Sequence, residues 1–179
     1  MASLKLLTIS GSLRKGSFNR MLLAEAATAF GEAEVMQADL NLPLYDGDLE
    51  DADGVPAVVQ TLADQIADAD AVVIAGPEYN KGISGVLKNA LDWVSRTEGN
   101  PWAGKPTVVI SAAAGRTGGE TQLFMTQHCL AQLGVLLVPG PGVMVAAAYE
   151  AFDDEGRLKA DSYRKALGAR MENLRAAAS

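Results

Sequence analysis

Residues 4–30 read LKLLTISGSLRKGSFNRMLLAEAATAF and place an apolar run, a polar loop and a helix-like segment in succession. The apolar run, residues 4–10, predicts a strand that ends at Gly11. Ser17 is a residue type that favours helix starts, and the apolar spacing after it predicts a helix to about Phe30. A strand that passes through a short loop into a helix is the repeating unit of a parallel sheet with helices on its faces.

The rest of the chain repeats this unit. Apolar runs predict further strands at residues 33–38, 69–75 and 105–113. A last strand is predicted at residues 135–138 and 143–145, and Pro139-Gly140-Pro141-Gly142 is a candidate interruption within it. Spacings of three and four predict helices at residues 56–66, 84–96, 119–133 and 161–175, with Ser84 as a cap. Residues 39–54 carry Pro43, Gly47 and Gly54 among acidic residues, so we expect a surface loop there. The pattern predicts one α/β domain over residues 1–179, with a five-stranded parallel sheet between helices.

Bulk composition narrows the function classes. The chain has 15 lysine and arginine residues against 22 aspartate and glutamate residues, a net charge of −7, so nucleic acid is not an expected partner. The apolar stretch at residues 135–149 is broken by prolines and glycines, so we expect no membrane span there. A single cysteine excludes an intrachain disulfide, and residues 1–9 carry no cleavable signal pattern. We therefore expect a cytoplasmic protein.

Three loops follow predicted strands and hold unusual residues. They are Gly11–Asn19 after the first strand, Gly76–Gly82 after the third and Ala112–Gly119 after the fourth. In open parallel sheets, ligands bind outside the carboxyl ends of the strands, near the point where strand order reverses. We therefore expect these three loops to form one site.

The first loop offers donors for an anion. It brings the hydroxyls of Ser10, Ser12 and Ser17, the Asn19 amide, the Arg14 guanidinium and the free N–H groups of a helix start. It matches neither the G-x-G-x-x-G dinucleotide pattern nor a P-loop. The alternative is that the serines only form a turn and a helix cap, and that Arg14 is a solvated surface charge.

The other two loops suit a flat heterocycle. Pro77, Glu78, Tyr79 and Asn80 combine backbone polar groups with side chains that can pack on a ring face, although a proline turn with a surface tyrosine remains the alternative. The third loop, which follows Ser111, is built from alanine and glycine and would let a ring edge approach the backbone. Its alternative is a flexible strand–helix connection.

Taken together, these blocks are familiar. Gly11-Ser12-Leu13-Arg14 with Ser17 and Asn19, then Gly76-Pro77-Glu78-Tyr79-Asn80, then Leu87-Lys88-Asn89-Ala90-Leu91-Asp92-Trp93, resemble the NADPH-dependent FMN reductase family. That family includes flavin, quinone, chromate and azo-dye reductases. The resemblance covers essentially the whole chain. It implies a flavodoxin-like, three-layer α/β/α fold with strand order 2-1-3-4-5 and non-covalently bound FMN.

The resemblance also implies roles for individual residues. The FMN phosphate would be bound by Ser12, Arg14, Ser17 and Asn19, in the loop that includes Phe18, and Ser10 would assist from the strand end. The isoalloxazine ring would be lined by Pro77, Glu78, Tyr79 and Asn80. The third loop would approach the ring or the ribityl chain with Ser111 and Gly115. The flavin would pass hydride from NAD(P)H to free flavin, a quinone, chromate or an azo compound by ping-pong kinetics, with no catalytic side chain. The alternative is a non-enzymatic electron carrier like true flavodoxin. Relatives imply a homodimer or homotetramer with helix 84–96 at an interface.

Five further residues have a less specific interpretation. Arg116 is either a contact for the NADPH phosphate or an exposed loop charge, and Trp93 is either core or a contact with a second subunit. Trp102 follows Asn100-Pro101 in a loop, where exposure would indicate an interface. His128 and Cys129 are expected to have no catalytic role, and no cluster has the spacing of metal ligands.

Overall fold

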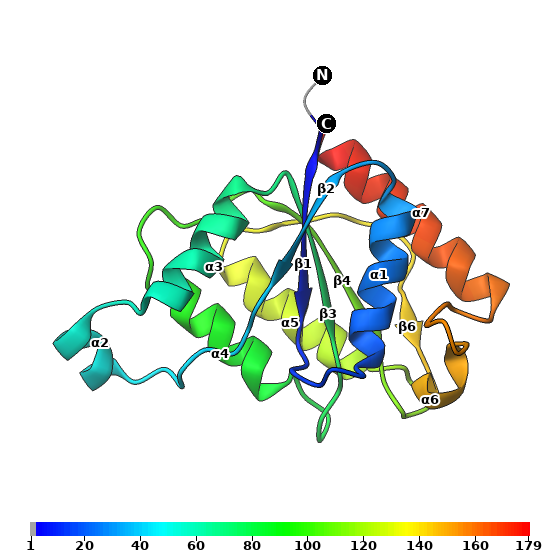
Figure 1. Cartoon of the computed structure of the whole chain (residues 1–179), viewed down its shortest axis with the longest axis horizontal. Helices are drawn as coiled ribbons and strands as arrows, with labels where there is room; N and C mark the ends of the chain where they lie inside the picture. The colour runs from blue at the N-terminus through cyan, green and yellow to red at the C-terminus, as the bar shows by residue number, and fades with distance from the viewer. Residues whose placement is uncertain (1–2) are drawn as a thin grey trace.

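The computed structural model describes residues 3–179, so the first two residues of the predicted domain lie outside it (Figure 1). A parallel sheet runs in the order β2-β1-β3-β4-β5, and β6 also pairs with β4. The strands are β1 Lys5–Ser10, β2 Glu34–Ala38, β3 Ala71–Gly76, β4 Pro106–Ala112, β5 Leu136–Leu137 and β6 Met144–Val145. The predicted strand order and flavodoxin-like architecture are confirmed.

Helices cover both faces of the sheet (Figure 1). On one face lie α1 (Phe18–Phe30) and α7 (Asp161–Ala177), and on the other lie α3 (Ala57–Asp68), α4 (Gly85–Val94) and α5 (Glu120–Gln132). Every residue of β3 is buried, because this central strand has a helical layer above and below it. The continuous apolar run that predicted β3 reflects this double coverage.

The two predicted helix caps are present. Ser17 Oγ accepts a hydrogen bond from the Asn19 amide at 3.2 Å, and Ser84 Oγ accepts one from the Leu87 amide at 3.4 Å. Ser84 Oγ also donates to the Gly11 carbonyl at 2.7 Å. The start of α4 is therefore tied to the loop after β1.

The expectation of a structureless loop at residues 39–54 is wrong. The segment contains α2 (Gly47–Asp53), which projects away from the sheet in Figure 1. Asp46 Oδ1 accepts from the Asp48 amide at 3.0 Å, and acidic residues in the first turn favour the positive end of the helix dipole. Pro43, Gly47 and Gly54 suggested breaks, but Gly54 ends the helix at a φ of 76° and Gly47 begins it.

The last strand is interrupted, as the sequence suggested. β5 pairs with Pro106 and Thr107 at the start of β4, and β6 pairs with Ser111 and Ala112 at its end. Residues 139–142 lie between the two short strands. The short helix α6 (Ala148–Ala151), which follows β6, was not predicted.

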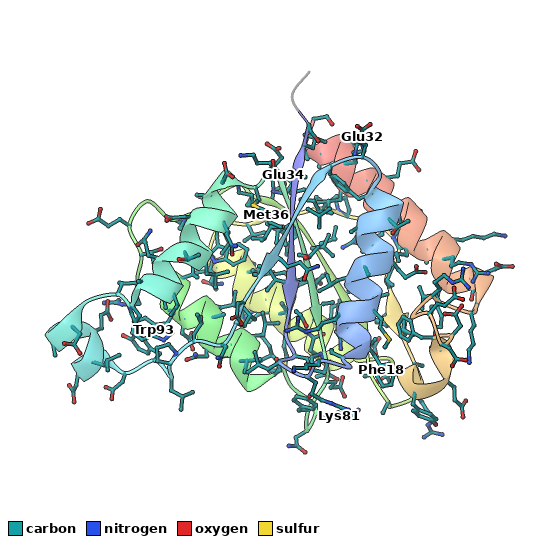
Figure 2. The ribbon with its side chains drawn as sticks, viewed as in Figure 1. Phe18, Glu32, Glu34, Met36, Lys81 and Trp93 are labelled. Atoms are coloured by element: carbon teal, nitrogen blue, oxygen red, sulfur yellow. The ribbon has the colours of Figure 1, made fainter. Side chains whose placement is uncertain are left out.

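The segment from residue 39 to residue 54, which we call the arm, is anchored on α4. Trp93 is fully buried, its Nε1 donates to the Pro43 carbonyl at 2.8 Å, and its ring meets Tyr45 edge-on with centroids 5.0 Å apart (Figure 2). Asn89 Nδ2 donates to the same carbonyl at 2.9 Å, and Arg96 forms an ion pair with Glu50 in α2 at 2.9 Å. Trp93 is therefore a core residue of this chain.

Trp102 is not exposed, so it does not give the sign of an interface that exposure would have given. It is buried, with an indole nitrogen that has no hydrogen-bond partner within residues 3–179. Within the same described range, no helix has the length and apolar character needed to cross a bilayer.

The two tryptophans allow a test of the arm's anchor. Trp93→Phe should lower the free energy of unfolding by about 1–3 kcal/mol in urea titrations, because it removes a hydrogen bond as well as packing. Amide exchange in residues 42–49 should also become faster. Trp102→Phe is the matched control, since its indole N–H makes no bond to lose. Equal exchange rates for these amides in both variants would contradict the anchor.

Candidate functional site

The three predicted loops converge at one end of the sheet. Register places Ser10 beside Ala75 and Gly76 beside Ser111, so β1, β3 and β4 end at the same edge. A pocket of about 270 Å³ opens there, and we call it the strand-end pocket. Its walls are Ser12, Arg14, Gly16, Ser17, Phe18, Asn19, Pro77, Glu78, Tyr79, Ala112, Ala113 and Ala114.

Two glycines bring the loops together. A Cβ on Gly11 would lie 3.1 Å from the Gly76 Cα, and a Cβ on Gly76 would lie 2.4 Å from Gln122 Nε2. The Gly11 amide donates to the Ala75 carbonyl at 2.8 Å, which continues the β1–β3 ladder into the loop. A larger residue at Gly11 would push the first loop away from the second, and one at Gly76 would press on the Gln122 side chain of α5.

The first loop presents unused donors to the pocket. Ser12 Oγ accepts from the Arg14 amide at 3.4 Å and Ser17 Oγ accepts from the Asn19 amide, so both hydroxyl protons remain available. The amides of Gly16 and Phe18 have no acceptor within residues 3–179, and the exposed Arg14 has no carboxylate partner in that range. Hydroxyls, free amides and a guanidinium at a helix N-terminus are the donor set that binds a phosphate.

The polar groups of three predicted ligand residues form hydrogen bonds within the protein. Asn19 forms two hydrogen bonds with the Ala112 backbone, each 2.9 Å long, which tie α1 to the end of β4. Ser10 Oγ donates to the Ser12 carbonyl at 3.1 Å, and the fully buried Ser111 donates to the Gly76 carbonyl at 2.8 Å. Asn19 still lines the pocket, but Ser10 and Ser111 do not.

Glu78 has a role that sequence reasoning missed. Its Oε2 accepts from the Thr121 amide at 3.1 Å and from the Gln122 amide at 3.4 Å, at the start of α5. Gly119, the cap position of that helix, has no side chain to do this. Glu78 therefore clamps the second loop onto the helix that follows the third, and Lys81 lies 3.3 Å from its other oxygen.

The tip of the second loop is a tight turn. The Tyr79 amide donates to the Gly82 carbonyl at 3.2 Å, and Asn80 and Lys81 adopt φ angles of 50° and 63°. Tyr79 is 54% exposed and lines the pocket mouth, whereas Asn80 does not reach the pocket. Figure 2 shows Lys81 at the same end of the sheet as Phe18.

The third loop contributes its alanines. Ala112, Ala113 and Ala114 line the pocket, whereas Gly115 and Arg116 are exposed and lie outside its wall. Together with Gly16, these alanines line the pocket although they were not among the predicted ligands. Their small side chains could have indicated this position in the sequence, since a wall close to a bound ring has room for little more than a methyl group.

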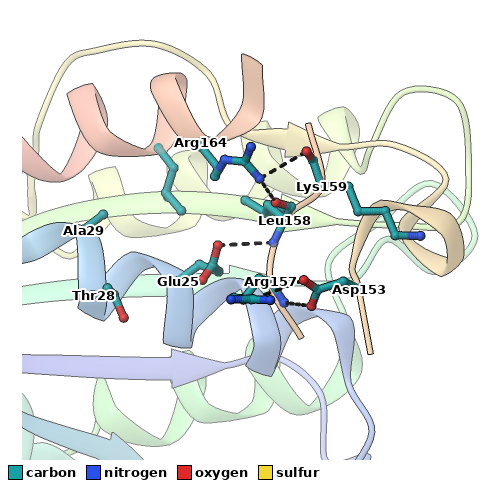
Figure 3. Close-up of a pocket in the computed structure, with 9 residues that line it drawn as sticks. Glu25, Thr28, Ala29, Asp153, Arg157, Leu158, Lys159 and Arg164 are labelled. Carbon is teal, nitrogen blue, oxygen red and sulfur yellow. Dashed lines mark hydrogen bonds and ion pairs between the residues drawn. The ribbon is translucent and has the colours of Figure 1, made fainter. Parts of the chain in front are cut away.

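A larger cavity, of about 660 Å³, lies between α1 and the segment before α7 (Figure 3). Most of its charged groups already have partners: Arg157 Nε lies 3.1 Å from an Asp153 oxygen, Glu25 accepts from the Leu158 amide at 3.2 Å, and Arg164 bonds the Leu158 carbonyl. Lys159 is the other cation on its wall, and among residues 3–179 the wall has no serine hydroxyls or free helix-start amides like those of the strand-end pocket.

The fold is flavodoxin-like, and the donors at the strand ends are the kind that suits the phosphate of a cofactor. The sequence profile described as NADPH-dependent FMN reductase matches residues 4–150. This chain belongs to that family, as its loop motifs predicted. It is an FMN-dependent oxidoreductase with NAD(P)H as co-substrate.

Individual relatives agree with this assignment. The chain is 40% identical to NAD(P)H-dependent FMN reductase PA1204 of Pseudomonas aeruginosa, over 96% of this chain and 93% of the relative. It is 41% identical to a quinone reductase of Escherichia coli, over 79% of this chain and 77% of the relative. The solved structure of FerB, a flavoenzyme NAD(P)H:(acceptor) oxidoreductase from Paracoccus denitrificans, superposes with a TM-score of 0.87 at 30% identity, covering 98% of this chain and 97% of FerB.

Arg14 provides the test of the phosphate site. Arg14→Ala should weaken FMN binding by about 1.5–3 kcal/mol, because it removes a charged hydrogen bond to the phosphate. Fluorescence quenching of FMN during titration of the apoprotein measures this. Lys15→Ala removes a neighbouring exposed charge outside the pocket wall and should leave the affinity nearly unchanged. Equal losses of FMN affinity in the two variants would mean that Arg14 acts only through the overall positive potential of the loop and not through a direct hydrogen bond.

Proposed function

We propose that the FMN phosphate lies against the first loop and that the isoalloxazine ring lies between the second and third loops. Ser12, Ser17 and the Gly16 and Phe18 amides would hold the phosphate together with Arg14. Pro77, Tyr79 and the alanines of the third loop would flank the ring. In this assignment the loops are held in place by Asn19, Ser10, Ser111 and Glu78. Asn80 and Gly115 would not contact FMN directly.

We further propose that the physiological acceptor is a quinone. The ring side of the pocket is walled by Pro77, Glu78, Tyr79 and alanines. Glu78 is the charged member of this wall; its carboxylate accepts from the amides at the start of α5 and would repel an anion. Such a mouth favours a flat neutral molecule over an oxyanion such as chromate. Two relatives support the choice by their names: the quinone reductase of Escherichia coli and a 2-hydroxy-1,4-benzoquinone reductase of Burkholderia, which is 36% identical over 97% of this chain.

Bound FMN supplies the capacity to accept a hydride from NAD(P)H and to pass on two electrons. The residues of the first loop, Pro77 and Tyr79 would bind and orient the cofactor, and the exposed Tyr79 would lie where a substrate can approach it. With NAD(P)H and the quinone using that place in turn, the oxidised nicotinamide would leave before the quinone enters. The overall reaction converts NAD(P)H, a proton and the quinone into NAD(P)⁺ and the hydroquinone.

Steady-state kinetics test this proposal. With NADPH and a benzoquinone varied together on flavin-loaded protein, we expect parallel double-reciprocal lines. A soluble benzoquinone should give a higher kcat/KM than chromate or free FMN. Intersecting lines, or preference for chromate, would contradict the quinone assignment. Retention of FMN through gel filtration would distinguish a resident cofactor from a released product.

For the cellular form, we propose a cytoplasmic homodimer or homotetramer that uses the α4 region. Most of α4 is buried inside this chain, and the arm covers part of it, so the arm would supply the contact surface. Leu44 on the arm is 82% exposed, and Tyr45 and Leu49 beside it are also exposed. Neighbouring exposed apolar side chains are a common mark of an interface.

Light scattering after size-exclusion chromatography tests the arm. Leu44→Asp should shift the protein toward the monomer, because it places a charge in the proposed interface. Tyr149→Asp alters another exposed apolar side chain outside the arm and should leave the mass unchanged. A wild-type monomer, or an unaltered mass for Leu44→Asp, would contradict this interface.

A further inference from the structure

A third cavity lies where the last strand is interrupted. Between its pairings with β5 and β6, residues 108–110 of β4 have no strand neighbour on that side within the described chain. A cavity of about 510 Å³ fills this gap, and we call it the edge cavity. Its walls are Val109, Leu123, Phe124, Gln127, Leu137, Val138, Pro139, Gly140, Gly142, Met144 and Arg170. It shares no wall residue with the strand-end pocket.

Arg170, from α7, is a buried charge in this cavity. Its side chain is 6% exposed, and a Cβ on Gly140 would lie 3.1 Å from its Nη1. No acidic residue lines the cavity, and within residues 3–179 the guanidinium forms no ion pair. Its Nε is buried without any partner. Burial lowers the pKa of Arg170, yet a guanidinium stays protonated in proteins, so the charge remains without a counterion.

The unpaired edge of β4 adds further polar groups. The Val138 amide donates to the Thr107 carbonyl and the Ser111 amide donates to the Val143 carbonyl, each at 3.0 Å. Alternation along the strand therefore turns the N–H and C=O of Val109 toward the gap. Neither has a backbone partner there within the described residues. The Gln127 amide, which can donate and accept, lies on the same wall.

We infer that the edge cavity binds a small organic carboxylate with an apolar body. A carboxylate matches the planar donors of Arg170, and the Val109 amide supplies one more donor. The remaining walls include Leu123, Phe124 and Met144, which would cover an aromatic or branched aliphatic group. The volume suits such a molecule. Inorganic phosphate would leave these apolar walls uncovered, and a neutral ligand would leave the charge unpaired.

The site can be tested without measuring activity. We would titrate 4-fluorobenzoate into the full chain with FMN added and follow ¹⁹F line broadening, recording flavin absorbance in the same samples. We expect saturable binding that Arg170→Met weakens by at least about tenfold, the loss expected for a charged hydrogen bond. Flavin absorbance should stay constant, which separates this site from the strand-end pocket and keeps the result independent of the proposed quinone activity.

Lys165→Met is the matched control, because it removes an exposed positive charge from the same helix. It should bind like the wild type. Arg170→Met should fold at least as stably as the wild type, since it replaces an unpaired buried charge by an apolar chain. If it does not fold, Arg170→Lys should still bind more weakly, because an ammonium lacks the two-pronged geometry.

Four results would overturn the inference. The first is an absence of saturable binding to the wild type, and the second is equal binding by the wild type and Arg170→Met. The third is flavin absorbance that changes in step with the ¹⁹F signal. The fourth is displacement of fluorobenzoate by inorganic phosphate at equal concentration.

Discussion

The ends of β1 and β3 lie so close together that a Cβ on Gly11 would lie only 3.1 Å from the Gly76 Cα. This approach sets the distance between the loop that holds donors for a phosphate and the loop that would flank the ring. Ser84 strengthens it, because one hydroxyl caps α4 and bonds the Gly11 carbonyl. Asn19, at the start of α1, joins the end of β4 to these two strand ends through its two hydrogen bonds to Ala112. The pocket is therefore built from contacts between strand ends before any ligand enters.

Local sequence patterns predicted the parts of this structure that depend on local physics. Apolar runs located the strands, because a doubly covered strand such as β3 must be apolar throughout. Ser17 and Ser84 marked helix starts through bonds within three residues. The arm was predicted wrongly because Pro43, Gly47 and Gly54 break helices in most contexts, and here a seven-residue helix begins at Gly47 itself and ends before Gly54.

The candidate site was less predictable, because its residue roles depend on partners far along the chain. Asn19 bonds a residue 93 positions away, and Glu78 bonds amides 43 and 44 positions away. Nothing in the first loop or in the Pro-Glu-Tyr-Asn block reveals those partners. A motif residue can thus belong to a ligand site by holding its walls in place, and resemblance alone does not separate this role from direct contact.

The interruption between β5 and β6 has a consequence for solubility during folding. The outer edge of the sheet on that side consists of two strands of two residues each, separated by a segment with two prolines. A foreign strand needs a longer continuous row of free N–H and C=O groups to pair with, and proline removes donors from that row. The break that opens the edge cavity therefore also blunts the edge against β-sheet aggregation between chains.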